Sequence, residues 1–290
     1  MKKSIFLGTG AAELIPDPFC KCDVCEYARL HPDEQRGRSA FLYDESTCID
    51  FGPDIFMNAA KFNVNLSNLT DILITHTHGD HLSLENLNVI GCNIPKANHM
   101  FTLHMSVPAF NWIKNYCNAL TTSSNGYSNE LRNVQRGYFD VEVHNPYENF
   151  TVGNKVIFPV YGYHFAAPGE TAFNYRITEN GKTLLYALDT GVYTDETVEA
   201  LSHFPVDVLI MDATFGSKKM DETCTHLDAY TFVSQLERLY KNGIVTSSTK
   251  VFASHINHFN LWHHENYEKF LKENCIIDTT LARDGMTFEW

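Results

Sequence analysis

Short apolar runs that end in a histidine or an aspartate recur along this chain. Ile72, Leu73 and Ile74 form the clearest example and lead directly into a histidine-rich stretch. A β-branched and aliphatic run of this length is typical of a strand that is buried on both faces. The same pattern returns in segments 155–164, 182–189, 206–212 and 251–255. The sequence therefore predicts buried strands whose ends carry metal-binding or catalytic side chains.

Helical patterns separate these strands. Helices are expected at 55–62, 83–91, 195–203 and 229–240, and further strands at 4–7, 41–42 and 48–51. Thr194 is a candidate N-terminal cap and Gly243 a candidate helix terminator. Strands and helices that alternate along the whole chain predict an α/β fold: two β-sheets packed face to face with helices outside, an αββα sandwich. We expect one domain over residues 1–290.

Residues 93–150 differ from the rest of the chain. A helix is expected from Pro108 to Cys117, and a polar run follows at 121–135. The segment contains no recognisable motif. We interpret it as an elaboration near the active site that could cover it.

The histidine-rich stretch contains His76, His78, Asp80 and His81. In an extended backbone, residues two apart point the same way, so His76 and His78 can bind one ion. Gly79 is expected to permit a sharp turn that directs Asp80 and His81 toward a second ion. Imidazole and carboxylate ligands suit zinc, manganese or iron.

Three cysteines, Cys20, Cys22 and Cys25, lie within six residues of one another. Cysteines this close make poor disulfide partners, whereas their thiolates can share one tetrahedral zinc ion. Pro16 and Pro18 favour a loop here, so a metal would hold an irregular segment in place. The spacing therefore predicts a structural zinc site, which still requires a fourth ligand.

Composition limits the partners of the protein. The net charge of −13 repels a nucleic-acid backbone, and no basic cluster offsets it. The apolar residues near Met1 give way to Gly8 too soon for a signal peptide, and no other segment is long enough to span a bilayer. The five cysteines outside the trio are scattered, as in reduced proteins of the cytoplasm. A homodimer remains an open alternative.

Two motifs resemble a known family. The pattern HxHxDH at 76–81, after an apolar strand, resembles the signature of the metallo-β-lactamase superfamily of dinuclear metallohydrolases. Residues 8–29, GTGAAELIPDPFCKCDVCEYAR, resemble the N-terminal signature of its phosphoribosyl 1,2-cyclic phosphate phosphodiesterase branch, which carries a structural zinc on a CxCxxC loop.

The resemblance implies specific ligands. His76, His78 and His164 would hold the first ion; Asp80, His81 and His255 would hold the second; Asp189 would bridge them. His258 would complete the zinc site of Cys20, Cys22 and Cys25. Asp50 would accept a hydrogen bond from a metal-bound histidine, which is also compatible with its position at a strand end.

The resemblance also implies a reaction. Two cations would activate a bridging hydroxide that attacks a phosphodiester, with Asp80 orienting the water and His226 protonating the departing alkoxide. His203 is a second candidate for that histidine, whereas His263 and His264 are expected on the surface of the last helix. The expected substrate is a small or cyclic phosphodiester. The alternatives are a redox or cofactor-biosynthesis protein like one of the pyrroloquinoline quinone pathway, and a transfer-RNA processing nuclease.

Overall fold

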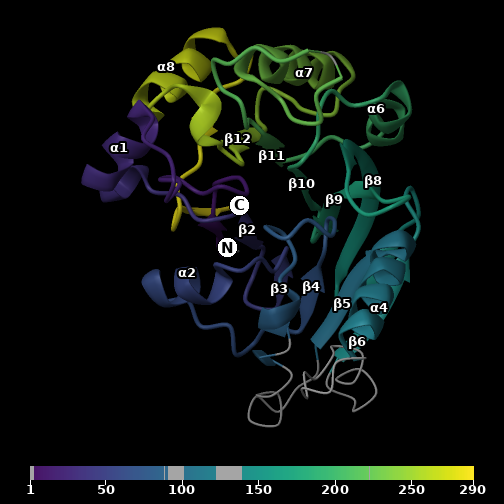
Figure 1. Cartoon of the computed structure of the whole chain (residues 1–290). Coiled ribbons are helices and arrows are strands. Elements are labelled where there is room, and N and C mark those ends of the chain that lie inside the picture. The colour runs from purple at the N-terminus through teal and green to yellow at the C-terminus, as the bar shows by residue number, and fades with distance from the viewer. Residues whose placement is uncertain (1–2, 88, 91–100, 122–138, 222) are drawn as a thin grey trace.

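Two β-sheets form the centre of the molecule (Figure 1). Each has seven strands among the residues that the structure describes. The computed structural model of the chain describes residues 3–87, 89–90, 101–121, 139–221 and 223–290. In spatial order, the first sheet contains β14 (Thr287–Glu289), β1 (Lys3–Gly8), β2 (Ala40–Leu42), β3 (Thr47–Ile49), β4 (Asp71–Leu73), β5 (Phe101–Ser106) and β6 (Phe139–His144). The second contains β13 (Thr279–Leu281), β12 (Lys250–Ser254), β11 (Val208–Asp212), β10 (Lys182–Ala187), β9 (Thr171–Glu179), β8 (Lys155–Phe165) and β7 (Phe150–Val152).

Helices cover the outer face of each sheet. In Figure 1, α6, α7 and α8 lie beyond β10, β11 and β12, whereas α2 lies on the opposite side of the molecule. The helices are α1 (Asp23–Leu30), α2 (Ile55–Lys61), α4 (Val107–Thr121), α6 (Asp195–Leu201), α7 (Ala229–Lys241) and α8 (His264–Asn274), with 3-10 turns η1 (Pro32–Glu34) and η2 (His258–Asn260). Residues 84–87 and 89–90 are also helical.

Alternation of side chains along the strands explains the four layers. On β4, Ile72 packs into the apolar cluster that contains Ile55 of α2, whereas Leu73 packs between the sheets with residues such as Tyr186 of β10. A third cluster joins the outer face of the second sheet to α6, α7 and α8. The predicted αββα sandwich is confirmed.

The expected capping residues Thr194 and Gly243 lie at helix ends, and Asp228 is a further cap that was not among the expected ones. The Thr194 hydroxyl accepts a hydrogen bond from the Thr197 amide at 3.3 Å, and Asp228 forms a capping box with Thr231 at the start of α7. Gly243 follows α7 with a φ of 71°, a left-handed conformation that glycine adopts readily.

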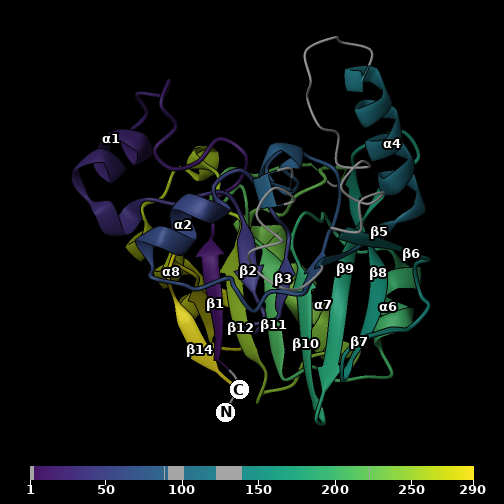
Figure 2. The same ribbon diagram turned by 90° about the horizontal axis from the view of Figure 1, so that it is seen from below.

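The structure adds strands that the sequence pattern did not indicate. β5 and β6 extend the first sheet with parallel pairing, and the expected helix after Pro108 is part of α4. Residues 91–100 and 122–138, on which much of the expected elaboration falls, lie outside the described residues. In Figure 2 the strands of both sheets are seen along their lengths, with β14 and β1 near the two termini. Within the described chain, no helix is long and apolar enough to cross a bilayer.

Candidate active site and cysteine cluster

The candidate metal ligands come together at the ends of strands from both sheets. His76, His78, Asp80 and His81 follow β4, His164 lies near the end of β8, Asp189 follows β10 and His255 follows β12. They form two groups whose ligand atoms all lie within 4.8 Å of one another: His76, His78, His164 and Asp189, and Asp80, His81 and His255. The structure thus brings together all seven predicted residues.

Asp189 lies between the two groups. Its Oδ2 is 3.7 Å from both His76 Nε2 and His164 Nε2. Its Oδ1 is 3.0 Å from His81 Nε2 and 3.1 Å from His255 Nε2. Although Oδ1 is buried, it has no hydrogen-bond partner among the described residues. A carboxylate that directs each oxygen at a separate set of imidazole nitrogens fits a bridge between two divalent cations.

Nitrogen separations in each group are those of ligands around one ion. His78 Nδ1 is 3.0 Å from His76 Nε2 and from His164 Nε2. In the second group, His81 Nε2 is 3.4 Å from His255 Nε2 and 3.3 Å from Asp80 Oδ2. Ligands about 2.0–2.2 Å from a tetrahedral metal lie at comparable distances from one another. The donor set therefore fits two divalent cations.

Hydrogen bonds hold the other ring nitrogen of four histidines. His81 Nδ1 donates to Asp50 Oδ2 at 2.7 Å, as expected for Asp50. His76 and His255 donate to the hydroxyls of Thr75 at 3.0 Å and Thr214 at 2.9 Å. His164 Nδ1 donates to the Thr225 carbonyl at 3.2 Å. These bonds fix the ring orientations and direct each Nε2 at the site.

Backbone conformation shapes the site. Asp50, Asp189 and His255 have φ values of 63°, 51° and 66°, which residues other than glycine adopt rarely. At Gly52, an added Cβ would lie 2.0 Å from the Asp80 carbonyl oxygen, so only glycine lets the 78–81 turn approach this closely. The expected turn is present at 79–81, but it does not require glycine, because the φ of Gly79 is not left-handed and its Cβ position faces open space. The turn instead closes by a bond from the His81 amide to the His78 carbonyl.

His226 borders the two groups and is the histidine best placed for proton transfer. Its Nδ1 donates to Asp212 Oδ2 at 2.7 Å, and its Nε2 lies 3.9 Å from Asp189 Oδ2. Burial opposes its charged form, but the Asp212 carboxylate outweighs burial and raises the pKa of His226 to about 9. Cations held by Asp189 would oppose this rise. His203, the second candidate, is exposed beyond the end of α6 and does not line the site.

Charges in the site are strongly coupled. Burial would raise the pKa of Asp189, but His255 and His81 outweigh it and hold that pKa well below its usual value. Burial lowers the pKa of His76 far below its ordinary range, helped by His81. Asp189 is therefore ionised and His76 neutral, as metal binding requires.

A cavity of about 370 Å³ opens onto this site. It is lined by five candidate ligands and His226, together with Glu13 and Asn257 from outside the metal groups. The Asn257 amide donates to Glu13 Oε2 at 2.7 Å. Among the described residues that line the cavity there is no lysine or arginine.

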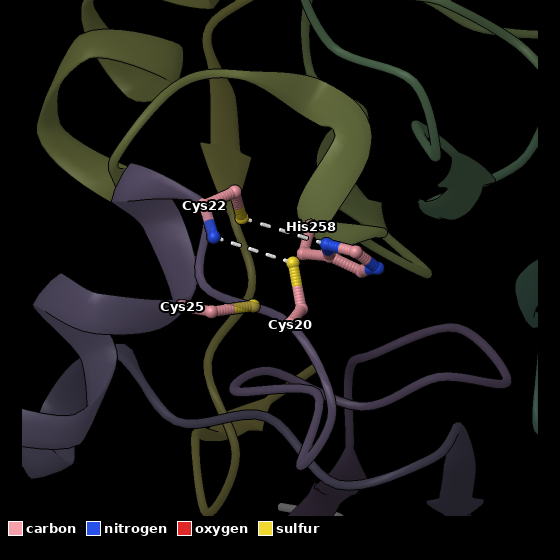
Figure 3. A group of neighbouring side chains, drawn as sticks. All are labelled: Cys20, Cys22, Cys25 and His258. Carbon is pink, nitrogen blue, oxygen red and sulfur yellow. Dashed lines mark hydrogen bonds between the residues drawn. The ribbon is translucent and has the colours of Figure 1, made fainter.

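The cysteine cluster forms a separate group (Figure 3). The side chains of Cys20, Cys22 and Cys25 lie together on one side of the ring of His258, with all four ligand atoms within 4.8 Å of one another. Cys22 Sγ is 3.6 Å from His258 Nδ1, and His258 Nε2 is 3.5 Å from Asp17 Oδ2. Three thiolates and one imidazole are a donor set of structural zinc sites. The group joins the loop before α1 and the start of α1 to η2.

Sequence comparison identifies the family. Residues 47–247 match the model of the β-lactamase superfamily domain. The chain belongs to the metallo-β-lactamase superfamily. Membership in this superfamily of metal-dependent hydrolases agrees with the grouped histidines and aspartates. No curated protein sequence matches the chain at a significant level.

Solved structures share the metallo-β-lactamase fold with this chain over its whole length. A diphosphatase of the PhnP family is 21% identical, with a TM-score of 0.74 over 100% of this chain and 98% of that one. Zinc-bound PqqB from Methylobacterium extorquens is 16% identical, with a TM-score of 0.71 over 99% and 100%. Human tRNase Z, short form, is 19% identical, with a TM-score of 0.63 over 99% and 98%. At these identities the likeness establishes the fold.

Sequence reasoning missed several residues of this metallo-β-lactamase site. The partnership of Asp212 with His226 was not assigned, although Asp212 ends a predicted strand. Thr214 and Asn257 lie in no motif, and Glu13 lies within the 8–29 signature but received no role from the sequence. The expectation that His264 lies on a helix surface is wrong: it is buried, with its Nδ1 2.9 Å from Arg36 Nη2.

Proposed function

We propose that the protein is a dinuclear metal-dependent phosphodiesterase that acts on a small or cyclic phosphodiester. Asp189 carries the proposal, because its two oxygens face two separate ligand groups. In this assignment His76, His78 and His164 would hold one ion, Asp80, His81 and His255 would hold the other, and Asp189 would be shared between them. Zinc or manganese suits the ligands best, and iron is a third option.

The ions would supply the chemistry that the side chains lack. Two bound divalent cations lower the pKa of a coordinated water and neutralise charge on phosphoryl oxygens. The protein's contribution is to hold its ligands rigidly before binding, through Asp50, Thr75 and Thr214. Asp80, a member of the second group, lies 3.3 Å from His81 Nε2 and lines the cavity, where it could orient the attacking water.

His226 is the proposed general acid. Asp212 holds its Nδ1 proton, so its Nε2 faces the cavity and can carry the proton that the departing alkoxide requires. The Asp212 carboxylate raises the pKa of His226 and so favours a protonated Nε2, whereas bound cations would reduce this rise. Asp212 acts through His226 by fixing the ring and stabilising its positive charge.

Charge and size favour a small substrate. The described lining of the cavity offers no basic side chain to a polyanion, and the chain has a net charge of −13. One phosphate group could instead be neutralised by the cations. The Glu13 carboxylate is positioned to accept hydrogen bonds from hydroxyl groups, such as those of a sugar ring. We expect Glu13→Gln to raise KM for a ribose phosphodiester more than it lowers kcat.

A substrate panel tests the proposal. Protein with its metal content measured is given bis(p-nitrophenyl) phosphate, a ribosyl 1,2-cyclic phosphate and a transfer-RNA precursor. We expect hydrolysis of the first two to monoesters and little cleavage of the third. A fully metallated protein that leaves both small esters intact would refute the phosphodiesterase. Cleavage of the precursor alone would indicate a nuclease, and oxygen consumption without hydrolysis would indicate a redox protein.

A further inference from the structure

A third cluster of metal-ligand side chains lies outside both centres described above. It consists of His104 on β5 with Glu142 and His144 on β6. His104 Nδ1 is 3.1 Å from His144 Nε2, and Glu142 Oε2 is 3.6 Å from the first nitrogen and 3.9 Å from the second. We propose that these three side chains bind an additional divalent transition-metal ion, with zinc as the preferred metal.

Strand pairing places the three residues together. β5 and β6 are parallel, with His104 opposite Glu142 and Ser106 opposite His144. Residues two apart on a strand share a face, so Glu142 and His144 lie on the same side of β6. On β5, the neighbouring Leu103 and Met105 pack into the apolar cluster on the outer face of the sheet. His104 therefore points the other way, toward the second sheet.

A residue of the second sheet supports the cluster. The ring of Phe150, at the start of β7, stacks on His144 with 3.5 Å between ring centres and on His104 with 5.4 Å. This contact holds both imidazoles from one side. The candidate site thus lies where β6 and β7, the last strands of their sheets, meet.

Asp71 orients His104 as Asp50 orients His81. His104 Nε2 donates to Asp71 Oδ1 at 2.9 Å, and the Thr70 hydroxyl donates to Asp71 Oδ2 at 2.7 Å. The proton on Nε2 leaves the lone pair of Nδ1 directed at His144. A carboxylate behind a metal-bound histidine is a recurring arrangement in zinc sites. The 3.1 Å separation of the ring nitrogens also repeats the 3.0 Å separations of the proposed dinuclear centre.

Solvent can reach the cluster. The side chain of Glu142 is 56% exposed and that of His144 is 12% exposed, whereas His104 is buried. An ion could enter from the Glu142 side and complete its coordination with water. Two imidazoles and one carboxylate suit a four-coordinate zinc with one open position. The competing explanation is a direct hydrogen bond between the two rings, and metal counting distinguishes the two.

The experiment compares zinc content at one buffered free-zinc concentration. Full-length protein is brought to equilibrium by dialysis, and total zinc per chain is measured by mass spectrometry. We expect His144→Gln to contain one zinc fewer than the original protein. His203→Gln, which alters an exposed histidine away from every cluster, should lose none. Asp71→Asn should keep the ligands but bind the additional zinc about 10- to 100-fold more weakly.

Thermal unfolding supplies a second measurement. An ion that binds only the folded state raises Tm as its concentration rises. We expect the zinc-dependent rise in Tm to be smaller in His144→Gln and in Glu142→Gln. Because the side chain of Glu142 is half-exposed, its substitution should leave the fold intact. If His144→Gln and Glu142→Gln both match the original protein in zinc content and in this rise, the additional site does not exist and the rings share a proton. Zinc counts do not depend on turnover, so this result is independent of the proposed phosphodiesterase.

Discussion

The candidate dinuclear centre and the cysteine cluster both gather ligand atoms within 4.8 Å, but the chain builds them differently. The first takes its residues from the ends of strands, and hydrogen bonds hold four of its histidine rings. The second takes Cys20 from a loop, Cys22 from the N-cap of α1, Cys25 from the first turn of α1 and His258 from a 3-10 turn. The comparison indicates that the sheets pre-organise the candidate ligands of the first centre, whereas the segment before α1 would depend on a bound metal.

Loss of the Asp189 carboxylate, the proposed bridge, is expected to be the most severe change for the first centre. We expect Asp189→Ala to lower kcat/KM at least about 1,000-fold, because both ions lose a ligand and the charge between them. Metal analysis should show that the first centre retains fewer ions, whereas the zinc expected at the cysteine cluster is still bound. Asp195→Ala, which removes an exposed carboxylate on α6, is the matched control. Equal activity in the two variants would remove Asp189 from the mechanism.

His226→Ala distinguishes proton transfer from metal binding within the same centre. We expect a loss of about 100- to 10,000-fold in kcat with unchanged metal content, since the variant loses a general acid. The loss in kcat should be smaller for an ester with a good leaving group, such as p-nitrophenolate, than for an alkyl ester. The p-nitrophenolate leaving group needs little protonation. The control is His203→Ala. Loss of metal from His226→Ala would make His226 a ligand instead.

Cys22→Ser tests the dependence of the second centre on metal. We expect this variant to lose one zinc, to keep the ions near Asp189 and to unfold at a lower temperature, by about 2–4 °C for each kcal/mol lost. Amide hydrogen exchange should accelerate in residues 16–25 while residues 72–78 remain protected. Cys117→Ser, at a buried position outside the cluster, controls for loss of a thiol. If amide exchange accelerates equally in residues 16–25 and 72–78, the cysteine cluster does not differ from the first centre in its dependence on metal.

His264 contacts Arg36 of the N-terminal segment without any metal, and we expect this contact to make a smaller contribution to stability. Burial, together with Arg36, lowers the pKa of His264 to about 3, whereas an unfolded histidine titrates near its ordinary value. At a pH between the folded and the unfolded pKa, His264 is protonated in the unfolded chain but neutral in the folded one. The free energy of unfolding should therefore fall as the pH drops below the unfolded pKa, by at most about 1.4 kcal/mol per pH unit. His264→Gln should weaken this dependence in urea unfolding at several pH values. An unchanged slope would exclude His264 as its source.

The sequence by itself determined the strands that precede His76, Asp189 and His255, because local apolar patterns and residue spacing specify them. It also indicated the cysteine cluster, whose three thiols are close along the chain. The tertiary structure alone decided that Asp212 contacts His226, that His264 is buried against Arg36 and that His104 meets His144. These contacts join residues 14 to 228 positions apart. Local sequence patterns do not predict such pairs, because sheet register and helix packing bring the residues together only when the chain folds.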